Sequence, residues 1–381
     1  MSPASFDFQS RTRVVSGAGS IGRVGGLARD LGVKHVLLVT DAGIVSAGHA
    51  GRVEQALTDA GLRVITFDKV RENPTTKCVD DCVAVAKSAG ADCLIGLGGG
   101  SSMDTAKGCN FILTNGGRMQ DYWGVGKATK PMLPFIAIPT TAGTGSELQC
   151  AALIADEATH QKMACLDPKC AAVVAMLDPV LTLSQPPRVT ACTGIDAIAH
   201  AVETAVTTKR NEISQKLSVE AFQLCVAAFP EVMARPDHLD ARARMQVGAA
   251  LAGAAIEHSM LGAAHAAANP LTAHCGIVHG HAVGLMLPHV VRFNAQDAAA
   301  HAIYEQLATN NGLGRNADQL AANLAELLRQ AGLTQTLALC GVNRETISTL
   351  ADEAARQWTA TFNPRPVTKE DFVRLYEGAF G

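Results

Sequence analysis

Four histidines lie close together in the segment Gly262–Ala282, and histidine is the side chain that most often binds metal ions in proteins. Four in one segment is more than a single metal site usually needs, so their roles should differ. The same segment holds Asn269, an amide among potential ligands. The four histidines are His265, His274, His279 and His281.

A second segment, Gly194–Thr204, places Asp196 and His200 four residues apart, which on a helix puts both side chains on one face. Such a pair often forms only a surface hydrogen bond. This segment is mostly apolar, however, so a buried pair needs a further partner. His265 and His279 are candidates, and together the four could supply one carboxylate oxygen and three imidazoles to a divalent ion. This mixed ligand set suits Fe²⁺, Zn²⁺, Co²⁺ or Ni²⁺.

The segment Leu94–Gly108, LIGLGGGSSMDTAKG, is typical of a phosphate-binding loop. A buried strand leads into three glycines and two serines, after which a helix begins. Glycines let backbone N–H groups approach a phosphate, and the helix N-terminus adds positive potential. The serines could instead simply cap the helix, but a cap does not require three glycines. The loop residues are Gly98, Gly99, Gly100, Ser101 and Ser102.

The segment Ile138–Glu147 repeats this pattern of strand, threonine and glycine, followed by an expected helix start. Two such loops at the carboxyl ends of strands predict a crevice for a dinucleotide. Asp41, after the run His35–Thr40, could accept hydrogen bonds from the adenosine ribose. A carboxylate there would repel the extra phosphate of NADP, which favours NAD. Asp41 could also merely cap the following helix.

A third glycine-rich segment, Gly17–Gly22, matches G-x-G-x-x-G literally. The chain before it is short, and the sequence GSIGRVGGLA is equally typical of a plain helix entry. We favour a structural role for these glycines, because this motif alone is weak evidence for dinucleotide binding.

Short apolar runs alternate with helical patterns in the first half of the chain, which predicts an α/β fold with a parallel sheet. Helical patterns occupy Gly51–Gly61 and Lys77–Gly90. The expected strands are His35–Thr40, Arg63–Phe67, Cys93–Gly98, Phe135–Thr140 and Ala171–Met176.

The pattern changes at Pro186-Pro187, after which no strand is expected and apolar residues recur every three or four positions. We therefore predict an α/β dinucleotide-binding domain over residues 1–185 and an all-helical metal and substrate domain over 186–381. The expected helices include Ala241–Ala268, Gln296–Gln306, Asn316–Ala331 and Lys369–Phe380.

Composition bounds the class of protein. The chain has 381 residues, of which 48% are hydrophobic and 18% charged, with a net charge of −3. These values favour a soluble two-domain protein and give no indication of a nucleic-acid or membrane partner. We expect no signal peptide or membrane span, and the 11 irregularly spaced cysteines indicate reduced thiols in a cytoplasmic protein.

Taken together, these motifs resemble those of the iron-containing (group III) alcohol dehydrogenases of the dehydroquinate-synthase-like superfamily. The segments GGGSSMDTAKG, PTTAGTGSE, GIDAIAHAVE and His279–Asn294 occur in the family's order and spacing. The resemblance covers nearly the whole chain. It implies the same two domains, an N-terminal α/β nucleotide domain and a C-terminal helical metal domain.

The resemblance also implies roles for single residues. The metal ligands would be Asp196, His200, His265 and His279. The pyrophosphate loop would be Gly98, Gly99, Gly100 and Ser101, and the second nucleotide loop would use Thr140, Thr141 and Thr144. Asp41 matches the acidic residue linked to NAD preference, and Asn73, Lys162 and Leu183 would line the cofactor cleft.

The chain departs from the family at Asn269, since many members carry a second histidine there, four residues after the third ligand. An amide does not titrate near neutral pH, so Asn269 would orient groups rather than carry protons. The proton would then leave through His274, a cofactor ribose hydroxyl or water. His274 and His281 flank the third and fourth ligands and either could support a ligand, but we expect ordinary exposure for both, and for His289 a structural role.

We thus expect hydride transfer between NAD and a small primary alcohol, with Fe²⁺, or else Zn²⁺ or another divalent ion, and a homodimer or higher assembly paired near Arg13–Ser16. One alternative is a hydroxyacid dehydrogenase, for example for 4-hydroxybutyrate, or a hydroxyacid–oxoacid transhydrogenase. A carboxylate substrate would need a cation such as Lys162, Arg292 or Lys127. A non-catalytic binding protein is disfavoured, because it needs no open metal site.

Overall fold

The computed structural model describes residues 6–159 and 161–381 and divides the chain into two compact units. An α/β unit comprises residues 9–141 and 145–185. A helical unit comprises residues 186–381 together with 142–144 and 6–8. The main division thus falls at Pro186, whereas residues 142–144 of the second glycine-rich loop group with the helices.

The α/β unit is built on a six-stranded sheet in the order β1-β9-β6-β4-β2-β3, with every pair parallel. Four of the expected strands are confirmed to within one residue, and the fifth begins three residues later than expected. The strands are β1 (Arg13–Ser16), β2 (His35–Val39), β3 (Arg63–Phe67), β4 (Cys93–Gly98), β6 (Phe135–Pro139) and β9 (Val174–Leu177).

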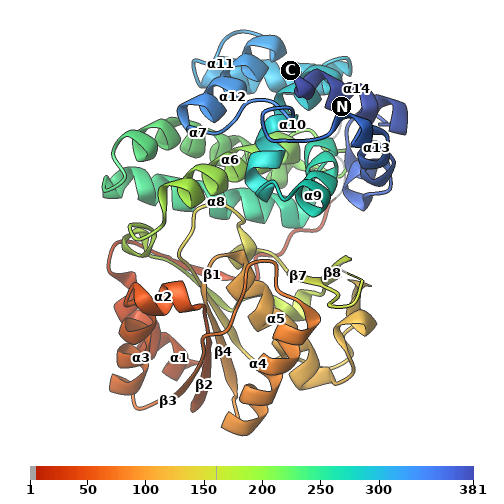
Figure 1. Cartoon of the computed structure of the whole chain (residues 1–381). Coiled ribbons are helices and arrows are strands. Elements are labelled where there is room, and N and C mark those ends of the chain that lie inside the picture. Colours follow the sequence, from red (N-terminus) through yellow and green to blue (C-terminus); the bar gives the residue numbers. More distant parts are fainter. Residues whose placement is uncertain (1–5, 160) are drawn as a thin grey trace. The chain divides into compact units, whose positions relative to one another are not determined.

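Helices cover both faces of this sheet, which explains why its strands are nearly continuous apolar runs. Figure 1 shows α1 and α3 beside the strands on one side and α4 and α5 on the other. Side chains of β2 alternate accordingly: Val36 and Leu38 join the core with α1 and α3, and Leu37 and Val39 join the core with α4 and α5. The helices are α1 (Val24–Asp30), α2 (Ala42–Ser46), α3 (His49–Asp59), α4 (Thr76–Ala89) and α5 (Gly100–Asn115).

A second, three-stranded sheet was not expected. It has the order β5-β8-β7, with β7 and β8 antiparallel. Its strands are short, β7 is rich in alanine, and one face of β7 and β8 is only partly buried, so their apolar pattern is weak. They are β5 (Gly124–Val125), β7 (Ala151–Ala155) and β8 (Lys162–Leu166).

The prediction of a helix after the second glycine-rich loop is wrong, because only a short 3₁₀ turn, Ser146–Leu148, forms there. The buried ammonium of Lys107 on α5 donates to the carbonyl oxygens of Ser146, Gln149 and Ala151 at 2.7, 2.9 and 3.0 Å. The Lys107 side chain thereby satisfies carbonyl oxygens of this segment without a helix. The chain therefore turns into β7 instead.

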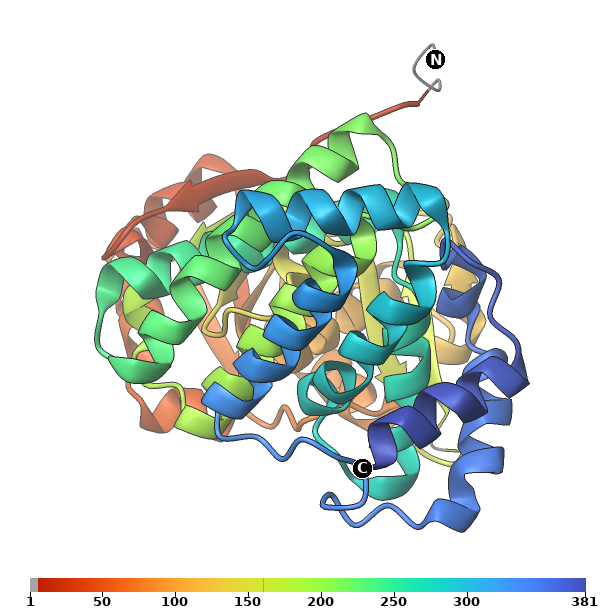
Figure 2. The same ribbon diagram turned by 90° about the horizontal axis from the view of Figure 1, so that it is seen from above.

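The second unit is helical, and the described residues after 186 contain no strand, as expected. Figure 2 shows its later, blue helices beside the cyan segment of α9 and α10, and α12 and α14 pack on α10 while α13 packs on α9. Its helices are α6 (Pro187–Thr204), α7 (Glu212–Ala234), α8 (Leu239–Ser259), α9 (Ala263–Cys275), α10 (His279–Asn294), α11 (Ala298–Asn310), α12 (Ala317–Gln330), α13 (Ile347–Ala355) and α14 (Lys369–Phe380).

One expected helix, Ala241–Ala268, is in fact two, because α8 and α9 meet at an angle of 106°. The break lies at Met260, whose φ of 68° is left-handed and cannot continue a right-handed helix. Gly262 follows and begins α9 without a side-chain cap of its own. The break matters for the site, because it sets the direction in which α9 carries His265.

Helix α7 has the length and hydropathy of a membrane span, and among the described helices it alone passes that test unaided. Its buried side chains include Phe222, Cys225 and Phe229, and it packs against α6 and α8. The ring of Phe229 occupies the space beside Gly194, where a Cβ atom would lie 2.4 Å from it. These contacts explain the apolar composition of α7, which is a core helix of this unit.

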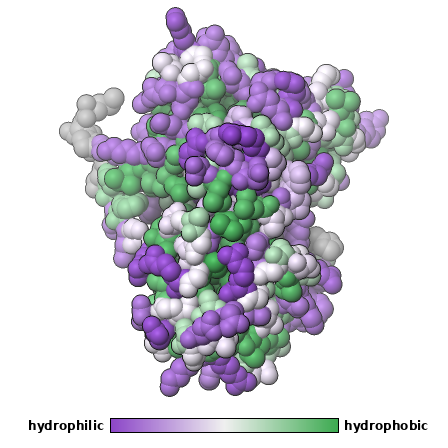
Figure 3. Space-filling view, turned by 90° about the vertical axis from the view of Figure 1, so that its left-hand side faces the viewer, coloured by the Kyte–Doolittle hydropathy of each residue, from purple (hydrophilic) through white to green (hydrophobic). Residues whose placement is uncertain are grey.

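The molecular surface is mixed in polarity. On the face shown in Figure 3, green apolar patches lie among purple polar ones. Large apolar side chains at the surface include Val14 of β1, which is 46% exposed at the edge of the six-stranded sheet. All 11 cysteines are free and 9 of them are buried, which confirms the expectation of reduced, mostly buried thiols.

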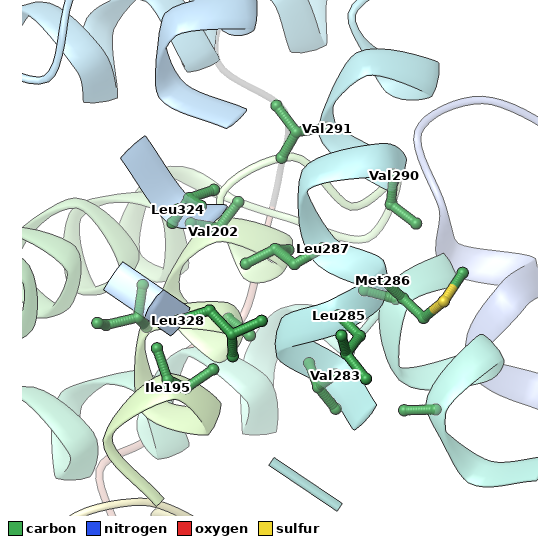
Figure 4. Packing of buried hydrophobic residues seen from close by; sticks show 14 of the residues in the cluster. Ile195, Val202, Val283, Leu285, Met286, Leu287, Val290, Val291, Leu324 and Leu328 are labelled. Atoms are coloured by element: carbon green, nitrogen blue, oxygen red, sulfur yellow. The ribbon is translucent and has the colours of Figure 1, made fainter. Parts of the chain in front are cut away.

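The core of the helical unit is formed where α10 packs on α6 and α12. In Figure 4, Val283 and Leu287 of α10 lie among Ile195 of α6 and the leucines of α12. The helices approach closely because α10 lacks side chains at Gly280 and Gly284. A Cβ atom at Gly280 would lie 2.1 Å from the carbonyl oxygen of Cys192.

A test of the helix packing compares two neighbouring glycines of α1. A Cβ atom at Gly25 would lie 2.0 Å from the carbonyl oxygen of Ala56 on α3, whereas none of the described atoms lies within 4 Å at Gly26. Gly25→Ala should therefore lower the free energy of unfolding by about 1–3 kcal/mol, through overpacking. Gly26→Ala should raise it by about 0.5–1 kcal/mol, because alanine is the better helix former. Urea unfolding of both variants measures the difference, and equal stabilities would refute this account.

Candidate metal centre and nucleotide loops

Asp196 and His200 lie on the buried face of α6, as their spacing predicted. Both are 5% exposed, and Asp196 Oδ1 lies 3.6 Å from His200 Nε2. Burying a carboxylate and an imidazole one turn apart costs free energy unless further hydrogen bonds or a bound ion compensate the loss of solvation.

Two further helices bring His265 and His279 to the same place. His265, on the first turn of α9, has its Nε2 atom 3.4 Å from Asp196 Oδ1. The rings of His265 and His279 are 5.4 Å apart between centroids, and the rings of His200 and His265 stack at 4.7 Å. One ligand atom from each of Asp196, His265 and His279 lies within 4.8 Å of the others. The four residues predicted as ligands therefore meet, from three helices.

The close approach of α10 to α6 places His279. The next residue is Gly280, and a Cβ atom on it would lie only 3.0 Å from Cβ of Asp196. Any larger residue at position 280 would push α10 away, and His279 with it.

The unpaired polar atoms of this cluster fit a bound cation. Asp196 Oδ1 and His265 Nε2 are buried and, within the described residues, have no hydrogen-bond partner. Leaving such atoms unpaired costs about 1–3 kcal/mol each. A divalent ion would compensate an oxygen and a nitrogen lone pair together.

Electrostatics keeps a negative charge in this cluster. Burial by itself would raise the pKa of Asp196, but the facing imidazoles, chiefly that of His200, hold that pKa well below its ordinary value. Burial lowers the pKa of His200. Against the effect of burial, the carboxylates of Glu203 and Asp196 raise the pKa of His265 to about 9. The centre thus attracts positive charge, as a metal site requires.

Sequence reasoning missed Glu203. It lies on the same face of α6 as Asp196 and His200, seven residues after the aspartate, and that spacing could have revealed it. Its Oε2 atom lies 2.5 Å from Nδ1 of His265, on the side of the ring opposite to Nε2.

The remaining histidines of the segment lie elsewhere. His274, in the last turn of α9, is exposed and contacts Glu353 at 2.8 Å. Nine residues separate it from His265, about 13 Å along the helix. The exposure expected for His281 is wrong, because this residue is 3% exposed and its Nε2 atom contacts the carbonyl oxygen of Thr334 at 2.7 Å. The cause is the segment after α12, which covers the first turn of α10.

Asn269 lies on α9 one turn beyond His265 and is half-buried. Its side-chain N–H donates to Oε1 of Gln357 at 3.0 Å. This contact fixes the amide, so the position where relatives carry a histidine holds an oriented, uncharged group. His289 packs against Gly378 of α14 and its pKa is lowered by burial, in keeping with a structural role.

In the α/β unit, the loop between β4 and α5 has the backbone that its glycines allow. Gly98 has φ of 146°, and a Cβ atom there would lie 2.3 Å from Oγ of Ser102. Gly99 begins α5 and no side chain caps that helix, so the serines do not act as caps. The first backbone N–H groups of α5 therefore remain available to a ligand.

Asp41 caps the following helix and also lies beside the glycine loop. Its Oδ1 atom caps α2 by accepting from the backbone N–H of Ile44 at 3.0 Å. Its other oxygen, Oδ2, would lie 3.5 Å from a Cβ atom at Gly98. The carboxylate thus lies beside the glycine loop, where a ribose hydroxyl could reach it.

The other predicted cofactor residues are only partly brought together. Thr141 is adjacent to Gly99, since a Cβ atom on Gly99 would lie 3.5 Å from Cγ2 of Thr141. Lys162 Nζ lies 3.5 Å from Asn73 Oδ1. Three further residues belong to the same prediction: Thr140, which is buried, Leu183, which is 40% exposed, and Thr144, which groups with the helical unit.

A buried charge cluster next to this loop was also missed. Lys107 is fully buried, and it donates to Oγ of Ser146 at 2.9 Å in addition to three backbone carbonyls. Burial raises the pKa of Asp104 to about 6 and that of Glu147 to about 7, and the charge of Lys107 opposes both shifts. The spacing Asp-x-x-Lys on an apolar helix was the available indication. The cluster ties α5 to the second glycine-rich loop.

Comparison with known proteins agrees with these features. A family model described as "Iron-containing alcohol dehydrogenase" matches residues 11–179, and one described as "Fe-containing alcohol dehydrogenase family, C-terminal" matches residues 190–380.

Among curated relatives, the "NAD-dependent methanol dehydrogenase" of Bacillus methanolicus is 34% identical over 371 residues, covering 96% of this chain and 97% of the relative. The "Lactaldehyde reductase" of Escherichia coli (strain K12) is 33% identical over 373 residues, covering 96% and 97%. A crystal structure of 1,3-propanediol oxidoreductase superimposes with a TM-score of 0.95 at 30% identity, covering 99% of this chain and 100% of that one. The sulfoacetaldehyde reductase from Bifidobacterium kashiwanohense in complex with NAD⁺ gives a TM-score of 0.91 at 28% identity, covering 99% of each chain.

The buried carboxyl of Glu147 predicts a pH dependence of stability. Its pKa is about 7 in the folded protein against an ordinary value of 4.5, so between these pH values the folded state binds more protons. The free energy of unfolding therefore falls as pH rises through this interval. Glu147→Gln should reduce that fall by roughly 3 kcal/mol. Urea unfolding from pH 4.5 to 8 measures the slopes, with Glu157→Gln at an exposed position as control. Identical slopes in all three proteins would contradict the assignment.

Proposed function

The chain belongs to the iron-containing alcohol dehydrogenase family, and on that premise we propose which of its residues form the metal centre and the cofactor site. The protein is an NAD-dependent oxidoreductase that transfers hydride between NAD(H) and an alcohol/aldehyde pair. The metal ligands are Asp196, His200, His265 and His279. The observation that carries this proposal is the buried pair of facing atoms, Asp196 Oδ1 and His265 Nε2, for which the described part of the chain offers no hydrogen-bond partner.

The metal we propose is Fe²⁺, and Zn²⁺ or another divalent ion fits the same oxygen and nitrogen donors. When bound, such an ion acts as a Lewis acid toward an alcohol or carbonyl oxygen. The protein contributes the fixed geometry of three helices and excludes water, since Asp196, His200 and His265 are nearly inaccessible to solvent.

For the cofactor we propose that Gly98, Gly99, Gly100 and Ser101 bind the pyrophosphate at the N-terminus of α5. Asp41 accepts hydrogen bonds from the adenosine ribose of NAD and disfavours the extra phosphate of NADP. The supporting observations are the uncapped start of α5 and the position of Asp41 beside Gly98. The remaining residues of this site are Asn73, Thr140, Thr141, Thr144, Lys162 and Leu183.

Asn269 orients the reacting groups in this proposal and does not carry a proton. Its amide is held by Gln357, which leaves its carbonyl oxygen as an acceptor. The proton of the alcohol leaves through His274, a cofactor ribose hydroxyl or water. The exposed position of His274 and its contact with Glu353 favour the latter two routes.

As substrate we propose a small primary alcohol and its aldehyde. Names of the relatives include methanol dehydrogenase, lactaldehyde reductase and sulfoacetaldehyde reductase. A carboxylate substrate is less favoured, because two of the cations considered have other contacts: Arg292 with Asp318 at 3.6 Å and Lys162 with Asn73.

We further propose a cytoplasmic homodimer that pairs through β1. The supporting observation is that β1 ends the six-stranded sheet and exposes Val14 there. Light scattering tests the assembly, and a monomer at micromolar concentration would exclude it.

Removal and return of the metal tests the centre. Treatment with a chelator should abolish NAD-dependent alcohol oxidation, and Fe²⁺ or Zn²⁺ should restore it. His279→Ala should lose bound metal and at least roughly 100-fold in turnover together, because one ligand and its charge-stabilising geometry are gone. Metal analysis and NADH absorbance measure the two quantities. Full activity of a verified metal-free protein would overturn the proposal.

Replacement of Asn269 tests the proposal that this residue orients the reacting groups without transferring a proton. Asn269→His introduces a group that titrates near pH 6.5, so the pH profile of kcat/KM for alcohol oxidation should gain a step near that pH. Activity should rise as pH rises through this step, because the neutral imidazole accepts the proton. Steady-state kinetics from pH 5 to 9 measures the profile. A profile identical to that of the wild type would count against this role.

A further inference from the structure

Glu203 joins the metal centre to the start of another helix. It lies on α6 and is 2% exposed. Its Oε1 atom accepts from the backbone N–H of Ala264 at 2.7 Å, and its Oε2 atom contacts Nδ1 of His265 at 2.5 Å. Both oxygens of one buried carboxylate are thus used on the first turn of α9.

Helix α9 depends on such contacts because it cannot cap itself. Its first residue follows Gly262, which has no side chain to accept from the free N–H groups. A Cβ atom at Gly262 would lie 3.0 Å from Glu203 Oε1 and 3.0 Å from Asn363 Oδ1. Asn363 accepts from Ala263 N at 3.2 Å, so distant residues cap this helix in place of a local one.

The contact with Nδ1 determines which nitrogen of His265 faces the metal centre. A carboxylate only accepts hydrogen bonds, so Nδ1 must carry the proton and donate it. In the neutral ring the lone pair then lies on Nε2, the atom 3.4 Å from Asp196 Oδ1. A hydrogen bond from the second ring nitrogen to a carboxylate also makes an imidazole a stronger metal ligand.

We propose that Glu203 is a positioning residue of the metal centre, which fixes the ring orientation and the Nδ1–H tautomer of His265 while it caps α9. This inference rests on the metal centre proposed above. One carboxylate thus holds the start of α9, just after the break that follows α8, and also orients the nitrogen of His265 that would bind the metal.

A role in capping alone would give a different result upon mutation. In Glu203→Gln the amide oxygen can still accept from Ala264, so the cap and the side-chain volume are kept. The amide N–H₂ then faces Nδ1, and the ring must present its lone pair there and carry its proton on Nε2. Capping survives this change, whereas metal binding should be weakened.

The test measures metal affinity. Zn²⁺ and Co²⁺ dissociation constants, from competition with a chromophoric chelator, are compared among the wild type, Glu203→Gln and Glu203→Asp. The Asp variant keeps the charge, but it is one methylene too short to make both contacts. Both variants should bind metal about 10–100-fold more weakly, and the Co²⁺ absorption bands should shift. NADH binding, whose proposed residues lie mainly in the other unit, should stay unchanged, and urea unfolding of each variant reports whether the helical unit is folded.

The matched control is Glu353→Gln, which removes the other glutamate–histidine contact of α9, with His274 at the surface. It should bind metal as the wild type does. Metal affinity of Glu203→Gln within twofold of the wild type overturns the inference and leaves the proposed centre intact. A wild type that binds no metal overturns both.

A measurement on the wild type covers the case in which the variants do not fold. Nitrogen-15 imidazole correlation spectra of the Zn²⁺-loaded protein show which ring nitrogen of each histidine carries a proton. The inference requires one buried ligand histidine with a protonated Nδ1 in a strong hydrogen bond to a carboxylate. A ligand His265 with its proton on Nε2 would overturn it.

Discussion

A carboxylate oxygen of Asp196 faces an imidazole nitrogen of His265 at 3.4 Å inside a helical core, and neither atom has a hydrogen-bond partner there. Keeping two such atoms unpaired and buried is costly, so the surrounding structure must hold them in place. The break after α8 directs α9 toward them, and Gly280 lets α10 bring His279 close enough to join. The geometry of the helical unit follows from this constraint.

In the α/β unit the main constraint is different. The backbone N–H groups at the start of α5 must stay free for the anionic ligand that we propose there. Gly98 adopts a backbone that other residues disfavour, and α5 begins without a cap. The second loop is fixed by the buried ammonium of Lys107 rather than by a helix. Rigidity here comes from one charge that satisfies several carbonyls, which explains why a lysine is tolerated in the core.

Asn269 shows how a family scaffold can change its chemistry at one position. The metal ligands and the nucleotide loops match the family, whereas the amide of Asn269 is held by Gln357 where many relatives carry a titrating group. The change keeps a polar side chain on the same helix face and removes its charge. In the function that we propose, the proton path is therefore the step in which this chain differs from such relatives.

The sequence by itself determined the class of each half and four of the strands nearly to the residue, because periodicity is a local property of the chain, and it predicted the four residues that we propose as metal ligands. It did not reveal the small sheet, the break between α8 and α9, or the buried His281, since each depends on contacts between residues far apart. For Glu203 and Lys107 the helical spacing was an indication, but it did not show what each side chain contacts. A lone glutamate or lysine in a sequence is most often exposed, and only the tertiary structure decides that these two are buried and what they hold in place.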